Sequence, residues 1–265
     1  MSRKGGPAGN GRASLRSATL VFWHLRGTLR GMLNIFAKKQ NQTSGSLARA
    51  RLSRQVATRL EANPAVRKAK VDAAQIYYYP GFLSDAECDL LMRLIDANRR
   101  PSTLLAPSQD PEFRTSESCD LDRWSPQVQP IDERMANLIG VPPEHGETMQ
   151  GQRYAPGQQF RPHYDWFSEN QEYWAAMKAS GGQRTWTAMI YLNEVEEGGA
   201  TWFPQAGIRV APKRGMLLAW NNMKPDGAPN PATLHEGSPV VKGTKYIITK
   251  WFREFRWIHS PVQTY

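Results

Sequence analysis

The chain has 265 residues, of which 40% are hydrophobic and 22% are charged, so its composition is that of a globular protein and excludes wholesale disorder. It contains no run of about 18 apolar residues, which argues against a membrane-spanning helix. Its two cysteines, Cys88 and Cys119, exclude a disulfide-dense scaffold and leave a single disulfide between them open.

The net charge of +10 is distributed unevenly along the chain. Residues 1–75 contain 15 Lys and Arg but only two acidic residues, whereas the rest of the chain balances to −3. We therefore predict a basic N-terminal extension over residues 1–75, partly helical or disordered, joined to a mildly acidic globular part.

Within the extension, residues 15–36 repeat apolar side chains at helical steps and place arginines on another side. Such a basic amphipathic helix would lie on an anionic membrane surface, dock on an acidic partner or pack on its own domain. The apolar stretch is too short and too interrupted for a signal peptide. We therefore expect a cytoplasmic protein of prokaryotic type, membrane-peripheral if the helix binds lipid.

Residues 46–70 predict a further helix with a solvated basic face, and a turn or helix that begins at Pro64. No aromatic residues alternate with these basic residues, so no specific nucleic-acid module is expected.

The globular part is predicted over residues 76–258, followed by a C-terminal tail over residues 259–265. A strand at residues 76–79 precedes a capping box at Ser84 and Glu87, which predicts a helix up to about Arg99. A long polar loop over residues 101–125 and a helix over residues 130–139 follow. After residue 146, short strand-like runs alternate with Gly and Pro at 147–154, 159–165, 185–193, 200–203, 207–210, 215–220, 232–236 and 243–253.

This pattern predicts a mainly β fold with supporting helices, built as a sandwich or barrel, with a jelly roll among the options. In the strand near residue 163, side chains two positions apart share a face, so His163 and Asp165 project together. His235 lies in a later short strand and supplies a third ligand. Two histidines and one carboxylate form the facial triad of non-haem Fe(II) oxygenases, which leaves coordination positions open.

Lys245 follows His235 by ten residues and lies in a strand that we expect to be buried. A buried ammonium beside a metal requires an anion, and the distal carboxylate of 2-oxoglutarate would supply one while its keto-acid end binds the metal. Trp251 shares the strand parity of Lys245 and is expected to face the same pocket.

The order and spacing of these residues resemble the catalytic domain of the prolyl 4-hydroxylase family of 2-oxoglutarate- and iron-dependent dioxygenases. The resemblance covers residues 76 to 256, and the matching stretches are 152–165, 184–192, 198–204, 212–215 and 235–251. It implies a double-stranded β-helix, or jelly-roll, core.

The same resemblance implies site residues and cofactors. It implies Fe(II) bound by His163, Asp165 and His235, 2-oxoglutarate paired with Lys245, and ascorbate as a reductant. It adds Tyr154 and Thr187 as further cosubstrate contacts. Arg114, in the long loop, belongs to a short motif that many members share, and we interpret that loop as a substrate lid.

The resemblance implies hydroxylation of an aliphatic C–H bond, most simply prolyl 4-hydroxylation of a peptide or protein with conversion of 2-oxoglutarate to succinate. The sequence leaves open the same chemistry on a free amino acid or a lysyl residue, and a non-catalytic interaction protein that retains the fold.

Overall fold

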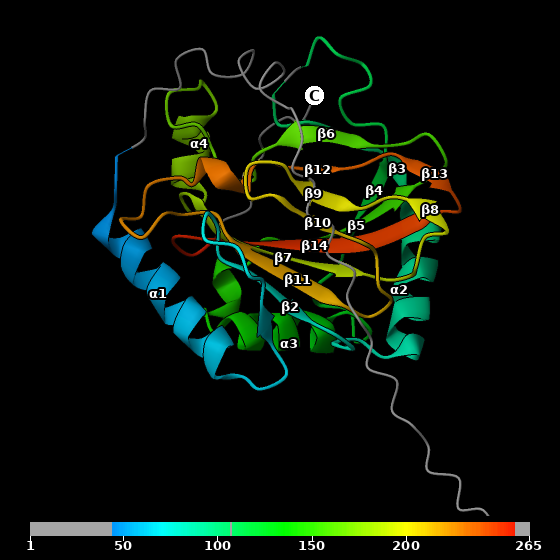
Figure 1. Ribbon diagram of the computed structural model, residues 1–265, viewed down its shortest axis with the longest axis horizontal. Helices are drawn as coiled ribbons and strands as arrows, with labels where there is room; N and C mark the ends of the chain where they lie inside the picture. Colours follow the sequence, from blue (N-terminus) through cyan, green and yellow to red (C-terminus); the bar gives the residue numbers. More distant parts are fainter. Residues whose placement is uncertain (1–43, 107, 258–265) are drawn as a thin grey trace, which may run out of the picture.

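The computed structural model describes residues 44–106 and 108–257, and Figure 1 shows them as two facing sheets with helices on one outer side. The larger sheet has eight antiparallel strands in the order β1-β2-β11-β7-β14-β5-β4-β3. These strands are β1 (Arg67–Lys68), β2 (Ile76–Tyr79), β3 (Arg100–Pro101), β4 (Glu117–Leu121), β5 (Met149–Tyr154), β7 (Arg184–Tyr191), β11 (Leu217–Asn221) and β14 (Lys245–Arg253).

A smaller sheet lies over one face of the larger one and has four strands in the order β10-β9-β12-β6. Its strands are β6 (Phe160–His163), β9 (Thr201–Phe203), β10 (Ile208–Val210) and β12 (His235–Gly237), and a separate pair joins β8 (Glu197–Gly198) to β13 (Val240–Lys242). The two facing sheets form the jelly-roll core that the sequence predicts.

Helices cover the other face of the larger sheet (Figure 1). The helices are α1 (Leu47–Ala62), α2 (Asp85–Asn98) and α3 (Gln129–Ile139), while the short α4 (Trp174–Ala179) lies apart from them, and single turns occur at η1 (Pro143–His145) and η2 (Pro231–Thr233). The capping box predicted at Ser84 is present at the start of α2. The backbone N–H of Glu87 donates to the Ser84 hydroxyl, and the Glu87 carboxylate accepts from the backbone N–H of Ser84. Buried α2 side chains such as Leu91 each stabilise the fold by roughly 1.5–3 kcal/mol.

The alternation of side chains along the central strands separates two cores. On β14, Ile248 and Phe252 face the helices, whereas Ile247 faces the smaller sheet. Strand β11 behaves in the same way, with Leu217 toward the helices and Trp220 toward the smaller sheet. The space between the two sheets is therefore separate from the core beneath the helices.

Several elements differ from their predicted ranges. The polar loop predicted over residues 101–125 contains β4, which pairs with β5 from Glu117 opposite Arg153 to Leu121 opposite Met149. The short α4 was not predicted. Both α1 and β1 precede residue 76, and α1 packs on the larger sheet while β1 forms one of its edges, so the packed unit includes residues before position 76.

Helix α1 confirms the first part of the helix predicted over residues 46–70, and a turn follows at Pro64, as one of the two predicted options. The last part of that range was predicted wrongly, because residues 67–68 pair with β2 as strand β1. The apolar stripe predicted over residues 15–36 and the tail over residues 259–265 lie outside the described residues. Both cysteines are buried and unpaired, which resolves the disulfide that the sequence left open. Among the described residues, no helix combines the length and apolar character needed to cross a membrane.

Candidate active site

Two histidines and an aspartate meet at one edge of the smaller sheet. His163 ends β6 and Asp165 follows two residues later, while His235 begins β12 and is the register partner of His163. One ligand atom from each of the three side chains lies within 4.8 Å of the others. The Nε2 atom of His235 is 3.8 Å from Oδ2 of Asp165. The sequence predicted this grouping, and the strand pairing of β6 with β12 produces it.

Backbone carbonyls orient both imidazoles. Nδ1 of His163 lies 2.8 Å from the carbonyl oxygen of Arg161, and Nδ1 of His235 lies 2.9 Å from that of Thr233. Because a carbonyl only accepts, each Nδ1 carries the proton, and each Nε2 keeps a lone pair for a metal ion. The ring of His163 also stacks on Phe160 at a centroid distance of 3.6 Å. The rings are therefore held in place before a metal binds.

The protonation of these groups suits a divalent cation. Burial, together with the neighbouring His235, lowers the pKa of His163 to about 3, so its imidazole is neutral. Burial acts to raise the pKa of Asp165, but His235, His163 and Arg184 outweigh it, and the pKa is lowered. Two imidazoles oriented by backbone carbonyls and one carboxylate fit a first-row metal with open positions.

A short hydrogen-bond chain fixes the carboxylate. The Thr187 hydroxyl donates to Oδ2 of Asp165 at 2.7 Å, and the Asn222 side-chain amide donates to the same hydroxyl at 3.0 Å. Thr187 is not among the residues that line the cavity described below. The structure thus places Thr187 behind Asp165, where it orients a ligand, while its predicted contact with a cosubstrate stays a prediction. Sequence reasoning missed Asn222, which no local motif marks.

Lys245 lies between the sheets at the start of β14, opposite Tyr154 on β5. Only 1% of its surface is exposed, and none of the described residues accepts a hydrogen bond or forms an ion pair with its ammonium. Its Nζ atom lies 5.2 Å from the centre of the Tyr154 ring and 5.7 Å from that of Tyr191. Burial alone lowers the pKa of Lys245 to about 7.

The triad and Lys245 line one narrow cavity of about 40 Å³ between the sheets. Tyr154 and Trp251 line it as well, and the predicted contact of Tyr154 with a cosubstrate stays a prediction. The hydroxyl of Tyr154 donates to Oε1 of Gln152 at 2.7 Å. The Arg184 guanidinium covers the Trp251 ring at 4.1 Å. The cavity therefore joins a metal-binding end to a buried cationic end.

The loop before β4 is attached beside this cavity. Arg114 donates to the Gln150 side chain at 2.7 Å and to the Thr103 carbonyl at 3.0 Å, and its guanidinium lies 4.7 Å from the centre of the Phe160 ring. Since Phe160 stacks on His163, Arg114 supports one metal-facing imidazole from behind. The role of the loop as a substrate lid stays a prediction.

Comparisons with known proteins agree with this geometry. Residues 149–253 match the family model described as the 2OG-Fe(II) oxygenase superfamily. The probable prolyl 4-hydroxylase 3 of Arabidopsis thaliana is 34% identical over 199 residues, which is 66% of this chain and 68% of that protein. Prolyl 4-hydroxylase 5 of the same plant is 36% identical, over 66% of each chain.

A solved structure is also similar. The viral collagen prolyl hydroxylase of Paramecium Bursaria Chlorella virus-1, in its 2OG complex, matches with a TM-score of 0.54 and 28% identity, over 67% of this chain and 95% of that chain. The fold and site define a 2-oxoglutarate- and Fe(II)-dependent dioxygenase. Within that class, the chain belongs to the prolyl 4-hydroxylase family. Its cofactors are those of the family, Fe(II) and 2-oxoglutarate, with ascorbate as the typical reductant.

Proposed function

We propose that the protein hydroxylates prolyl residues of a peptide or protein at the 4-position and converts 2-oxoglutarate to succinate and carbon dioxide. The observation that carries the proposal is the ammonium of Lys245, which no described residue neutralises and which lines the same narrow cavity as the three metal-binding side chains. An ammonium in that position needs an anion, and a dicarboxylate that also binds the metal supplies it.

In this proposal, His163, Asp165 and His235 hold the iron, and Lys245 pairs with the distal carboxylate of 2-oxoglutarate. With iron and 2-oxoglutarate bound, the site would reduce dioxygen, so that one of its oxygen atoms enters the substrate C–H bond and the other enters succinate. The chain's own residues hold the metal-facing side chains in fixed orientations through Thr187 and the backbone carbonyls. The walls between the sheets enclose the cavity, and the Tyr154 hydroxyl, which donates to Gln152, would have to turn in order to donate to a carboxylate of the bound diacid.

The prolyl substrate is supported by the relatives, which are named prolyl 4-hydroxylases. The same chemistry on a free amino acid or a lysyl side chain is the alternative. A non-catalytic protein that only retained the fold would not need the triad or the buried lysine. The presence of all four residues therefore supports an enzyme.

The direct test is to incubate the protein with Fe(II), 2-oxoglutarate, ascorbate and a library of proline-containing peptides. Mass spectrometry should find products heavier by one oxygen atom in step with succinate release. Peptides with lysine in place of proline, and free proline, are the matched controls. Modification of those controls with no change in any prolyl peptide would contradict the prolyl assignment and leave the dioxygenase class intact.

We further propose that residues 1–43, which carry eight Lys and Arg and no Asp or Glu, bind an anionic membrane surface. Removing them should leave turnover of a short peptide unchanged and abolish the salt-sensitive binding of vesicles that contain phosphatidylserine. Equal vesicle binding by the shortened and full chains would contradict this role. The cytoplasmic location stays a prediction.

A further inference from the structure

A second hollow lies on the outer side of the helix layer, between α1 and α3. Its volume is about 1230 Å³, and none of its lining residues lines the catalytic cavity. The two helices cover one face of the larger sheet, and the catalytic cavity lies on the other face. A molecule in this helix groove would therefore leave the route to the metal site open.

One wall of the helix groove is a stripe of α1. Exposed residues recur along it at steps of three and four, while Val56 and Leu60 on the opposite side of the helix are buried in the core. The stripe runs from Arg51 to Ala62, which corresponds to roughly 16 Å along a helix. This length suits a peptide segment of three helical turns, or about five residues in extended form.

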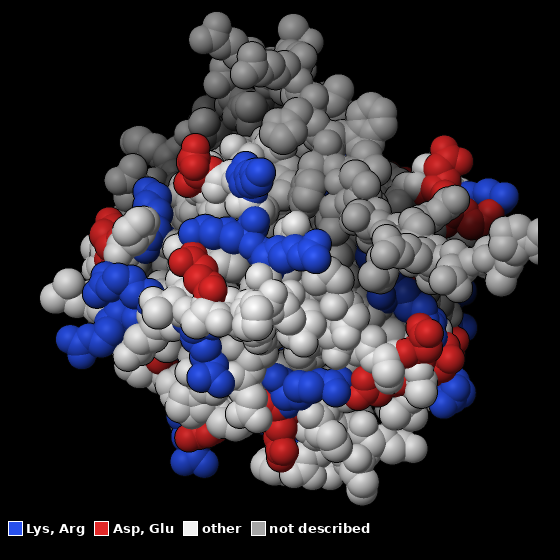
Figure 2. Space-filling model, turned by 60° about the horizontal axis from the view of Figure 1, so that its bottom comes forward, with Lys and Arg blue, Asp and Glu red and all other residues white. Residues whose placement is uncertain are grey.

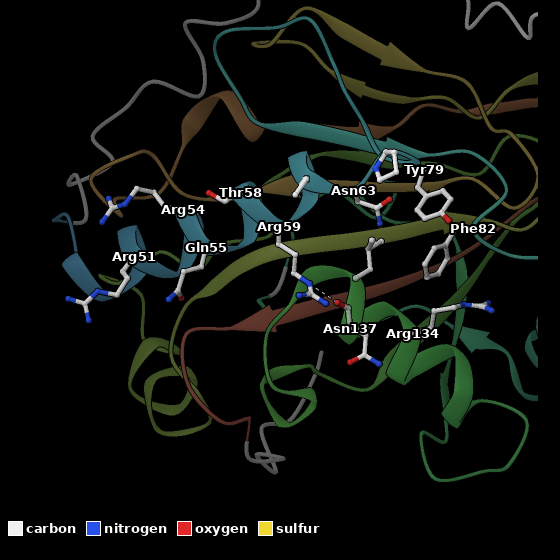
Figure 3. Close-up of a pocket in the computed structure, with 13 residues that line it drawn as sticks. Arg51, Arg54, Gln55, Thr58, Arg59, Asn63, Tyr79, Phe82, Arg134 and Asn137 are labelled. Carbon is white, nitrogen blue, oxygen red and sulfur yellow. Dashed lines mark hydrogen bonds between the residues drawn. The ribbon is translucent and has the colours of Figure 1, made fainter.

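The helix groove is positively charged. Arg51 and Arg54 form neither an ion pair nor a side-chain hydrogen bond with any described residue. In Figure 3, both side chains extend from α1 away from α3. Arg59 reaches across to α3, where it donates to the Asn137 carbonyl at 2.9 Å, so its charge meets no carboxylate. Arg134 is the exception, because Glu87 accepts from it at 2.8 Å.

Among residues 44–106 and 108–257, no acidic residue lines the helix groove. Figure 2 brings this side of the molecule forward and shows Lys and Arg side chains over it, some beside acidic side chains and others without one. The ligand that complements the groove is therefore anionic, and arginine forks match carboxylates in a bidentate geometry.

The far end of the helix groove is apolar. Tyr79 and Phe82 meet edge to face at 5.4 Å, and Leu138 lies beside them. Phe82 is only 7% exposed, and the Arg134 guanidinium covers its ring at 5.0 Å. An aromatic ring covered in this way offers no open face for a nucleic-acid base, which argues against single-stranded RNA. An apolar side chain that accompanies carboxylates fits this end.

The chain's own N-terminal extension does not match this site, because residues 1–43 carry eight basic residues and no acidic one. We propose that the helix groove docks an acidic, amphipathic segment of a partner protein. The carboxylates of that segment pair with Arg51, Arg54 and Arg59, and its apolar side chain packs on Tyr79 and Leu138.

Fluorescence anisotropy with the full chain tests this proposal. The probe is a labelled 12-residue peptide without proline that carries four Glu and a Leu–Phe pair. Saturable binding is expected, and Arg51→Glu combined with Arg54→Glu should weaken it at least tenfold. The matched control combines Arg93→Glu with Lys178→Glu, two exposed basic positions on α2 and α4, and should change the affinity less than twofold. Thermal melts of both variants establish that they fold.

Two further measurements identify the occupant and the site. Saturating probe should leave turnover of a short substrate peptide unchanged, because the helix groove and the cavity lie on opposite faces. A photo-crosslinking residue in place of Gln55 should join the chain to the probe. Absence of saturable binding, equal weakening in both double variants, crosslinking to residues 1–43 instead, or tighter Arg51-dependent binding of polyuridine or phosphatidylserine vesicles would each overturn the proposal.

Discussion

Replacing Lys245 by methionine should make the metal-free protein more stable and at the same time remove its affinity for 2-oxoglutarate. Methionine has a similar length and no charge, so it fills the same space between Tyr154 and Tyr191 without the desolvation penalty of an ammonium. A structural lysine would behave in the opposite way, because its removal would leave a partner unsatisfied.

The size of the effect follows from the lowered pKa. Burial moves the pKa of Lys245 from 10.5 in the unfolded chain to about 7 in the fold. At about 1.4 kcal/mol per pH unit, the buried ammonium destabilises the fold by about 4 kcal/mol at pH 7. Because the folded pKa is the lower one, the penalty is fully present below pH 7 and disappears as the pH rises toward 10.5. The Lys245→Met variant should therefore gain most in unfolding free energy at or below pH 7.

The same shift predicts the pH dependence of binding. A carboxylate binds the protonated lysine, so the affinity for 2-oxoglutarate should be constant below pH 7 and fall by up to about tenfold per pH unit above it. Calorimetric titration of 2-oxoglutarate into the protein loaded with Mn²⁺ measures this directly. Urea unfolding of the metal-free protein between pH 6 and 10 measures the change in stability.

Lys250 provides a matched control on the same strand. It is also fully buried, but it faces the helices, and its ammonium forms an ion pair with Asp132 and donates to the Glu147 carbonyl at 3.0 Å. Lys250→Met takes from Asp132 one of two cationic partners, the other being Arg123, and should destabilise the fold by about 1–3 kcal/mol without affecting the cosubstrate. If Lys245→Met were destabilised like Lys250→Met and kept its 2-oxoglutarate affinity, the reasoning on Lys245 would be refuted.

Three further predictions concern the site and the cysteines. Replacing any one of the three proposed iron ligands by alanine should abolish metal binding, measured by elemental analysis, with little change in the circular dichroism spectrum; a variant that still binds one equivalent would contradict the assignment. Thr187→Val should weaken metal binding about 10- to 100-fold and Thr187→Ser should restore it, because the hydroxyl orients Asp165; equal affinities for both variants would count against that role. Burial raises the pKa of both Cys88 and Cys119, so a thiol reagent should react with them slowly at pH 8 and rapidly in denaturant; fast reaction of the native protein would show that these thiols are accessible.

The sequence predicted most of the strands because their alternation and their Gly and Pro boundaries are local signals. Strand β4 was missed, since Glu117–Leu121 is a polar run with no strand-like alternation, and it is a strand only through its pairing with β5. Helix α1 was predicted, but its place in the core was not, because its many arginines mask the buried stripe that includes Leu60.

The site shows the same division between local and distant information. The face shared by His163 and Asp165 follows from strand parity, and the grouping with His235 follows from motif spacing. The predicted contact of Thr187 with a cosubstrate stays a prediction, whereas its hydrogen bond to Asp165 joins β7 to a residue beyond the end of β6 and could not be read from strand parity. The contact of Asn222 with Thr187 joins residues 35 positions apart, and no sequence pattern marks it.

Both metal-facing histidines belong to the smaller sheet and Asp165 follows its strand β6, whereas Lys245 belongs to the larger sheet. Packed sheets lie about 10 Å apart, and their separation is fixed by the side chains between them. In the proposed function, the spacing of the sheets therefore selects the length of the cosubstrate. The diacid would have to reach from the metal to Lys245, both of which line the same cavity. Cosubstrate selectivity is in this sense a property of the architecture, and changing it would require altering how the two sheets pack as well as the residues that touch the ligand.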